Sequence, residues 1–84
     1  MEILIGKVKH FFPKVSVAVV ELNDNLKIGD EIVIKNKKGE EKVKQIIESM
    51  EIDHKKVQSG KSGEEVAILV SGKVKEGDLV YKVS

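Results

Sequence analysis

The stretch Gly29-Asp30-Glu31-Ile32-Val33-Ile34 combines a glycine, an acidic residue and a following apolar alternation. The same pattern recurs in Gly63-Glu64-Glu65-Val66-Ala67-Ile68 and in Gly77-Asp78-Leu79-Val80-Tyr81-Lys82. Glycine tolerates the positive φ that a tight turn into a strand requires. The acid that follows can accept hydrogen bonds from backbone N–H groups of the turn. The three copies therefore predict three strands entered through the same turn, and we interpret their acids as structural rather than catalytic.

Alternating apolar residues extend this prediction to the rest of the chain. Valine and isoleucine supply most apolar positions, which is typical of strands. Turn signals such as Asn23-Asp24-Asn25 and Ser71-Gly72 separate the short apolar segments. Many short strands with this punctuation predict an all-β sandwich or barrel. We expect a small closed antiparallel barrel of six to seven strands, with strands at residues 3–10, 14–22, 30–35, 41–54, 64–70 and 78–83.

The segment 41–54 has two interpretations. Its middle part, Lys42 to Ile52, could form a short helix. Its alternation instead changes phase at Ile46-Ile47, and a bulge or sharp bend there would let one long strand serve two sides of a barrel. We favour the bent strand, because all neighbouring elements are predicted to be strands.

Length and composition indicate one small domain, residues 1–84. The absence of cysteine excludes disulfides and thiolate metal sites. The first residues, Met1 to Lys7, lack the features of a signal peptide. No apolar run approaches the ~18 residues that a membrane helix needs. We therefore expect a cytoplasmic protein without a membrane segment.

The charge is high in amount but balanced in sign. The 15 basic residues, all of them lysines, face 14 acidic residues. Arginine is the usual bidentate partner of phosphate and guanine, so its absence weakens a sequence-specific nucleic-acid interpretation. Lysine can still neutralise phosphates as a point charge. The Lys/Glu-rich, cysteine-free composition resembles that of heat-adapted (thermophile) proteins.

Motifs for catalysis or cofactor binding are incomplete. Gly60-Lys61-Ser62 resembles the end of a phosphate loop, but Lys55 stands where that loop needs its first glycine, and a strand rather than a helix should follow. His10 and His54, without cysteine, cannot complete a usual structural zinc site. No serine lies in a nucleophile elbow. We expect no enzyme activity, no metal, no nucleotide and no other cofactor.

Binding residues are easier to nominate. The segment His10-Phe11-Phe12-Pro13-Lys14 places both phenylalanines beside cations, where exposed rings can stack on bases or contact an apolar partner. The simpler alternative is that Phe11 or Phe12 plugs an open barrel end. The basic hairpin Lys35-Asn36-Lys37-Lys38 could contact phosphates. It could also be an ordinary solvated surface whose charges are screened by salt. The candidate RNA- or partner-binding residues are His10, Phe11, Phe12, Lys14, Lys35, Lys37 and Lys38.

The order of the motifs resembles the second domain of translational GTPases such as elongation factor Tu. The resemblance implies a closed β-barrel, which in those GTPases packs on the nucleotide domain and touches ribosomal RNA. This chain lacks the GTPase domain, and Ser71-Gly72 stands where the family often has Arg-Gly. No functional residue is carried over, because the shared positions are turn and packing residues. The segments that carry the resemblance are Ile5 to Val8, Val17 to Leu22, Leu26 to Ile34, Val43 to Met50, Ser62 to Val70 and Val74 to Val80.

A second resemblance leads to an alternative function. The opening from Gly6 to Phe12 is similar to that of the barrel at the C-terminus of collagenase-like peptidase-family proteins, some of which act on RNA. The first hypothesis is a stand-alone translation-factor-like module that binds tRNA or ribosomal RNA and has no GTPase activity. The alternative is a protein-interaction subunit that docks on a separately encoded enzyme of the peptidase-like kind through Phe11 and Phe12. A closed barrel has few free edges, so we expect a monomer.

Overall fold

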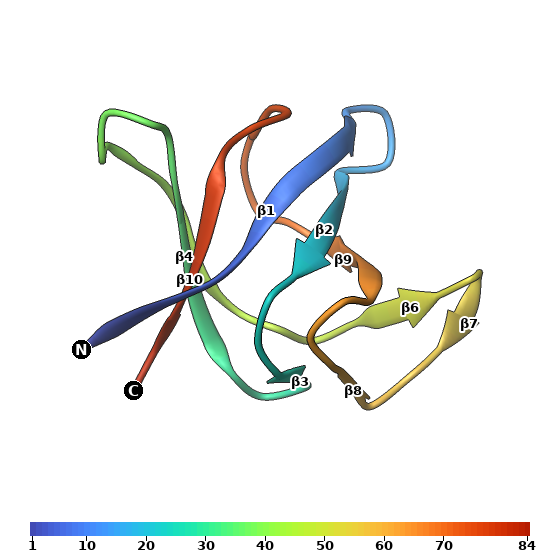
Figure 1. Ribbon diagram of the computed structural model, residues 1–84. Coiled ribbons are helices and arrows are strands. Elements are labelled where there is room, and N and C mark those ends of the chain that lie inside the picture. Colours follow the sequence, from blue (N-terminus) through green and yellow to red (C-terminus); the bar gives the residue numbers. More distant parts are fainter.

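Ten strands and no helix make up the computed structural model, which describes all residues, 1–84. Eight strands form one antiparallel sheet in the order β5-β4-β10-β1-β2-β9-β6-β7, and β3 pairs with β8. The main sheet curls around a single core (Figure 1). The all-β prediction is confirmed. The strands are β1 (Glu2–Phe12), β2 (Val17–Leu22), β3 (Leu26–Lys27), β4 (Glu31–Lys35), β5 (Glu41–Ile46), β6 (Met50–Ile52), β7 (Lys55–Lys56), β8 (Ser59–Gly60), β9 (Glu65–Leu69) and β10 (Leu79–Val83).

Each predicted strand segment contains an observed strand, but the sequence missed three short ones. The two-residue strands β3, β7 and β8 are too short to show an alternating pattern. The prediction of a strand through residue 54 is wrong at its end. Asp53 and His54 have φ values of 51° and 65° and turn the chain between β6 and β7. Two successive positive φ values are the signature of a tight type I′ hairpin, which usually carries Asn-Gly.

The predicted bend in the long segment is confirmed, and the helix alternative is wrong. Strand β5 pairs with β4, whereas β6 pairs with β9, so consecutive parts of the chain serve two sides of the molecule. Backbone hydrogen bonds to the turn that precedes β4 hold the chain at the bend. The N–H of Gly29 donates to the Ile47 carbonyl at 2.9 Å, and the N–H of Ile47 donates to the Asp30 carbonyl at 2.8 Å.

The strand pairing does not show the closed barrel that the sequence predicts. The hydrogen-bonded order runs from β5 to β7, and no strand pair joins its two ends. A side chain spans the gap between β5 and the end of β9. Gln45 Nε2 donates to the Leu69 carbonyl at 2.8 Å, and the N–H of Ser71 donates to Gln45 Oε1 at 2.7 Å. One amide group can make this double contact because it carries both donors and an acceptor.

The recurring glycine-acid turns are confirmed as a strand-entry device. The glycines at positions 29, 63 and 77 have φ values of 96°, 92° and 95°. In each copy the acid after the glycine accepts a hydrogen bond from the backbone N–H of a lysine three residues earlier. The pairs are Lys27 N–Asp30 Oδ2 at 3.0 Å, Lys61 N–Glu64 Oε1 at 2.7 Å and Lys75 N–Asp78 Oδ2 at 2.8 Å.

The connections between strands gather at two ends of the molecule. The connections 13–16, 36–40 and 70–78 form the upper end of Figure 1, and the connections 23–25, 28–30 and 61–64 form the lower end. The chain termini meet near the lower end, where the N-terminal amine of Met1 donates to the Ser84 carbonyl at 3.1 Å. No helix of the structure is suited to cross a membrane.

Candidate binding surface

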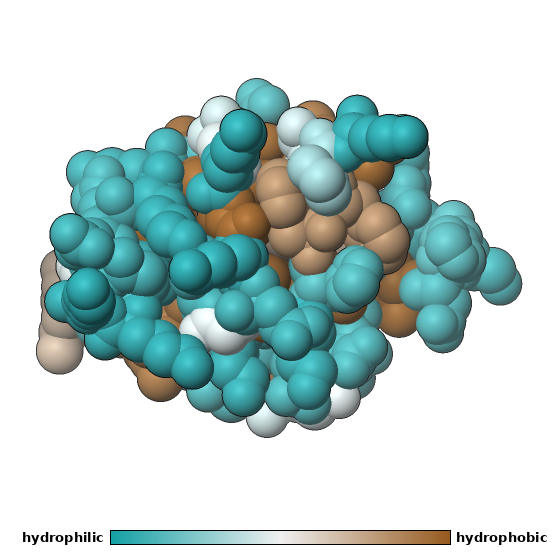
Figure 2. Space-filling view, turned by 90° about the horizontal axis from the view of Figure 1, so that it is seen from above, coloured by the Kyte–Doolittle hydropathy of each residue, from teal (hydrophilic) through white to brown (hydrophobic).

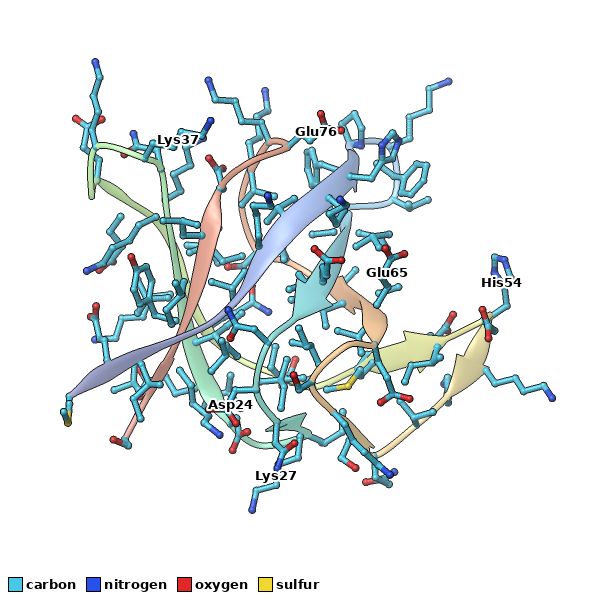
Figure 3. All side chains as sticks on the ribbon, viewed as in Figure 1. Asp24, Lys27, Lys37, His54, Glu65 and Glu76 are labelled. Carbon is cyan, nitrogen blue, oxygen red and sulfur yellow. The ribbon has the colours of Figure 1, made fainter.

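Six of the seven candidate residues lie at or beside the upper end. His10, Phe11 and Phe12 occupy the last part of β1, and Lys14 follows in the next connection. Lys37 and Lys38 belong to the connection between β4 and β5, which rises to the same end of the molecule (Figure 1). Two segments that are distant in the sequence therefore share one end of the fold. Figure 3 shows Lys37 there, near Glu76 of the connection between β9 and β10.

The two phenylalanines face opposite sides of the sheet. Phe11 is partner to Ala18, which is buried, and Phe11 itself packs against the core cluster. Phe12 is partner to Val17, and 46% of its surface is exposed. The plug interpretation therefore applies to Phe11, whereas Phe12 is free to contact a partner. The ring of His10 lies beside Phe12, with ring centroids 4.5 Å apart and planes tilted by 58°.

Lys35 is held away from the other candidate lysines. Its Nζ donates to Glu2 Oε1 at 2.6 Å and lies 5.2 Å from the centre of the Tyr81 ring. The hydrogen bond to Glu2 raises the pKa of Lys35 above its ordinary value of 10.5. An ammonium group engaged with a carboxylate and an aromatic face has less to offer an external phosphate. Lys37 and Lys38 are exposed at the hairpin tip instead.

An apolar stripe crosses the outside of the sheet beside the upper end. Phe12 pairs with Val17, and Val17 pairs with Leu69, so one row of apolar side chains spans β1, β2 and β9. Ile46 continues the row, because it lines the same groove of about 310 Å³ as Leu69. Val15, in the connection after β1, is also exposed, and its N–H donates to the Phe12 carbonyl at 3.3 Å. We define the apolar stripe as Phe12, Val15, Val17, Leu69 and Ile46.

Sequence reasoning found only Phe12 of this stripe. Its most exposed members are Val15, Ile46 and Leu69, at 59%, 56% and 52% of their surfaces. Strand alternation did contain a signal. Val66 and Ile68 point into the core. Because side chains alternate between the two faces of a strand, Leu69, one residue after Ile68, is expected to face solvent. The phase of Leu69 therefore could have nominated it.

The upper end is also basic. Its three connections carry five exposed lysines, whereas one of their three acids, Asp78, is buried. Lys42 Nζ pairs with Asp78 Oδ2 at 2.9 Å, so that acid does not offset the exposed charge. Seen from above, apolar atoms gather toward the middle of this end and hydrophilic side chains surround them (Figure 2). The exposed lysines are Lys14, Lys37, Lys38, Lys73 and Lys75.

The remaining chemical candidates do not come together. His54 lies at the tip of the β6–β7 hairpin, away from the upper end that His10 adjoins (Figure 3). The structure contains no group of three or more His, Asp or Glu side chains placed to hold a metal ion. The segment Gly60-Lys61-Ser62 leads into strand β9, as the sequence predicted, and Gly60 itself is buried. The structure therefore does not bring His10, His54 and the segment Gly60-Lys61-Ser62 together into one site.

Comparison with known sequences places the chain beside a much longer protein. No protein-family profile matches the chain. A protein described as an uncharacterized protease of Methanocaldococcus jannaschii is 46% identical to it over 80 residues, which are 95% of this chain. The chain spans only 19% of the length of that relative.

Comparison with solved structures identifies the fold. The C-terminal domain of a Geobacillus thermoleovorans protein assigned as a U32 peptidase matches with a TM-score of 0.87 and 18% identity, covering 96% of this chain and 92% of that one. The selenomethionine variant of the same domain matches with a TM-score of 0.85 and 18% identity, covering 93% and 96%. GDP-bound aIF5B from Aeropyrum pernix matches with a TM-score of 0.60 and 19% identity, covering 95% of this chain and 15% of that one. Both resemblances seen in the sequence are therefore confirmed, and the chain has the fold of the U32 peptidase C-terminal domain, with a more distant likeness to a translational GTPase.

Proposed function

We propose that this chain is a protein-binding module, without catalytic activity of its own, that works with a polypeptide of the U32 peptidase type. The observation that carries the proposal is the match at 46% identity to about one fifth of a protein described as a protease. The chain therefore corresponds to one segment of the longer relative and not to its whole. The matching fold, a C-terminal domain of a U32 peptidase, supports the same assignment.

The exposed apolar side chains support a protein partner. Phe12, Leu69 and Ile46 leave about half of their surfaces in water, although the core of the fold does not use them. Aromatic and aliphatic anchors of this kind provide much of the affinity in protein interfaces. The near-neutral net charge of +1 also favours a protein partner over a polyanion.

A second candidate function is binding of tRNA or ribosomal RNA. The observation that favours it is the upper end, which carries five exposed lysines and which the exposed pair of His10 and Phe12 adjoins. Aromatic rings stack on unpaired bases, and lysines neutralise phosphates. The distant likeness to a translational GTPase is consistent with this function but concerns the fold alone.

Affinity capture from a lysate of the source cells tests both functions. The tagged full chain is used at low and at moderate salt, protein is identified by mass spectrometry, and RNA is identified by sequencing. We expect a U32-type peptidase chain to be retained at both salt concentrations, since apolar contacts are not screened. Ribosomal RNA or tRNA that is recovered at low salt and lost at moderate salt would favour the second candidate instead, because phosphate contacts weaken steeply with salt. Absence of a U32-type chain at both salts would reject the proposal.

A further inference from the structure

We infer that the apolar stripe is the face on which the U32-type polypeptide packs. This inference rests on the proposed function and adds to it the location of the contact. Four of the five stripe residues lie on the outer surface of β1, β2, β9 and β5, and Val15 lies in the connection beside Lys14. The stripe therefore borders one basic connection but consists mainly of strand side chains. It therefore assigns affinity to apolar side chains of strands rather than to the basic loops.

The strand register makes the stripe a continuous surface. Partners in neighbouring antiparallel strands place their side chains on the same face, about 5 Å apart. Phe12, Val17 and Leu69 are such partners in succession. The gap after β9 would interrupt the row, but the two hydrogen bonds of Gln45 hold β5 against the end of β9. Ile46, the next residue, is thereby kept beside Leu69.

Four of the seven large hydrophobic residues that the fold leaves exposed belong to this stripe. Single exposed apolar residues are ordinary, but a contiguous patch on a small protein is a feature of interaction sites. A patch of this kind covers on the order of a few hundred Å². A stable interface needs about 800 Å² from each partner, so the stripe is the apolar centre of the contact and polar residues form its border.

The surroundings of the stripe select the occupant. The connections at its upper border carry the exposed Lys14, Lys73 and Lys75 together with Glu76, and the exposed Glu48 lines the groove beside Ile46 and Leu69. The upper border is therefore basic, whereas the side at β5 carries one acid. Two copies of this chain that met at the stripe in a symmetric pair would bring these like charges together, which is unfavourable. A protein surface with an apolar centre and acidic residues on the side that faces these lysines is the complementary partner. In the protease from Methanocaldococcus jannaschii, four fifths of the polypeptide lie outside the matched segment and are available to supply such a surface.

The other exposed apolar residues provide a matched control. Met1, Ile3 and Leu4 lie in and before the first part of β1, close to the chain termini. Ile3 and Leu4 are consecutive in a strand and therefore point to opposite faces. Leu4 is 43% exposed, similar to Phe12 at 46%, but its strand partner is Tyr81 rather than a row of aliphatic side chains.

The experiment is a binding titration with the purified U32-type chain that the affinity capture identifies. The full-length wild-type chain is compared with Leu69→Asp, Ile46→Asp and the control Leu4→Asp, and thermal unfolding verifies that each variant is folded. We expect each stripe variant to weaken the binding by about tenfold or more, whereas the control changes it by less than about twofold. A charge placed in the desolvated centre of the contact has no partner there, which is the reason for the difference.

The outcomes separate this inference from the function on which it rests. Unchanged binding by folded stripe variants, while the wild type still binds, overturns the location and leaves the proposed function intact. Failure of the wild type to bind any U32-type chain overturns both. Sedimentation of the wild-type chain alone distinguishes one more occupant. A dimer that the Leu69→Asp variant converts to a monomer would assign the stripe to a second copy and contradict the inference.

Discussion

The upper and lower ends of this molecule are built with the same turn but carry different surfaces. The connections of the lower end contain three acids and one lysine, namely Asp24, Asp30, Glu64 and Lys61. Those of the upper end contain five exposed lysines and adjoin the apolar stripe. Figure 3 shows Asp24 and Lys27 at the lower end and Lys37 and Glu76 at the upper end. The glycine-acid repeat therefore specifies the architecture, whereas residues outside the repeat make the two ends differ in charge and apolar surface.

The acid of the glycine-acid turn makes different contacts at the two ends of the molecule. Asp30 accepts the N–H of Lys27 at the lower end. Asp78, in the equivalent position at the upper end, accepts the N–H of Lys75 and also pairs with Lys42 at 2.9 Å. The side chain of Asp78 is 3% exposed and that of Lys42 is 24% exposed. The side chain of Asp78 therefore joins two segments of the chain, the connection between β9 and β10 and strand β5.

The largest expected effect concerns these two acids. Asp78→Ala should lower the free energy of unfolding by about 3 kcal/mol, because it leaves a half-buried Lys42 without its partner and a turn N–H without its acceptor. Asp30→Ala removes only the turn contact and should cost about 1 kcal/mol. Urea unfolding of both variants measures the difference. Equal losses would mean that the Lys42 pair adds nothing to the upper turn.

A smaller effect should distinguish the two phenylalanines of the upper end. Phe11→Ala removes a ring that packs against the core and should lower the free energy of unfolding by about 2 kcal/mol, less than for a fully buried ring. Phe12→Ala, on the outer face, should change it by about 0.5 kcal/mol or less. The same pair of unfolding curves is then compared with partner binding. We expect Phe12→Ala to weaken partner binding without loss of stability. If Phe11→Ala weakened binding and Phe12→Ala did not, the contact would involve the core-facing side of the sheet rather than its outer face.

The smallest effect concerns Lys35, which is held on the outer face by Glu2. Its pKa is raised, so the stabilisation from the pair is fully present below the ordinary value of 10.5 and is lost as the pH rises through the higher folded value. The difference in stability between the wild type and Glu2→Gln should therefore be constant from neutral pH to about 10 and shrink only above 10.5. Chemical denaturation across this pH range measures it. If the stability difference between the wild type and Glu2→Gln changed below pH 10, a titrating group other than Lys35 would be responsible for it.

The fold was largely predictable because its signals are local. Alternating valine and isoleucine define the long strands, and the glycine-acid turns define where three of them begin. The bend at Ile47 was predictable from a change of phase. The strands β3, β7 and β8 were not, because two residues cannot show a period. The turn at Asp53-His54 was missed because neither residue is the glycine that usually occupies a positive φ.

The candidate surface was predictable only in part, since it is assembled from distant segments. The sequence nominated the residues around Phe12 and the lysines near position 37, and the structure brings these to one end. It did not indicate that β1 extends through Phe12, so that Phe11 faces the core and Phe12 faces outward. It also did not indicate that Lys35 forms an ion pair with Glu2. Ile46 and Leu69 join Phe12 only through pairing across three strands and the Gln45 contact. Such contacts depend on register, which a single sequence does not specify.

The most direct test of the account is site-specific photo-crosslinking within the cell. A benzophenone amino acid replaces Leu69 in one variant and Leu4 in another, both exposed positions on strands. After irradiation, crosslinked peptides are identified by mass spectrometry. We expect position 69 to crosslink to a U32-type peptidase chain and position 4 not to do so. Crosslinks from position 69 to RNA alone, to a second copy of this chain, or to no partner while position 4 captures the peptidase chain, would contradict it.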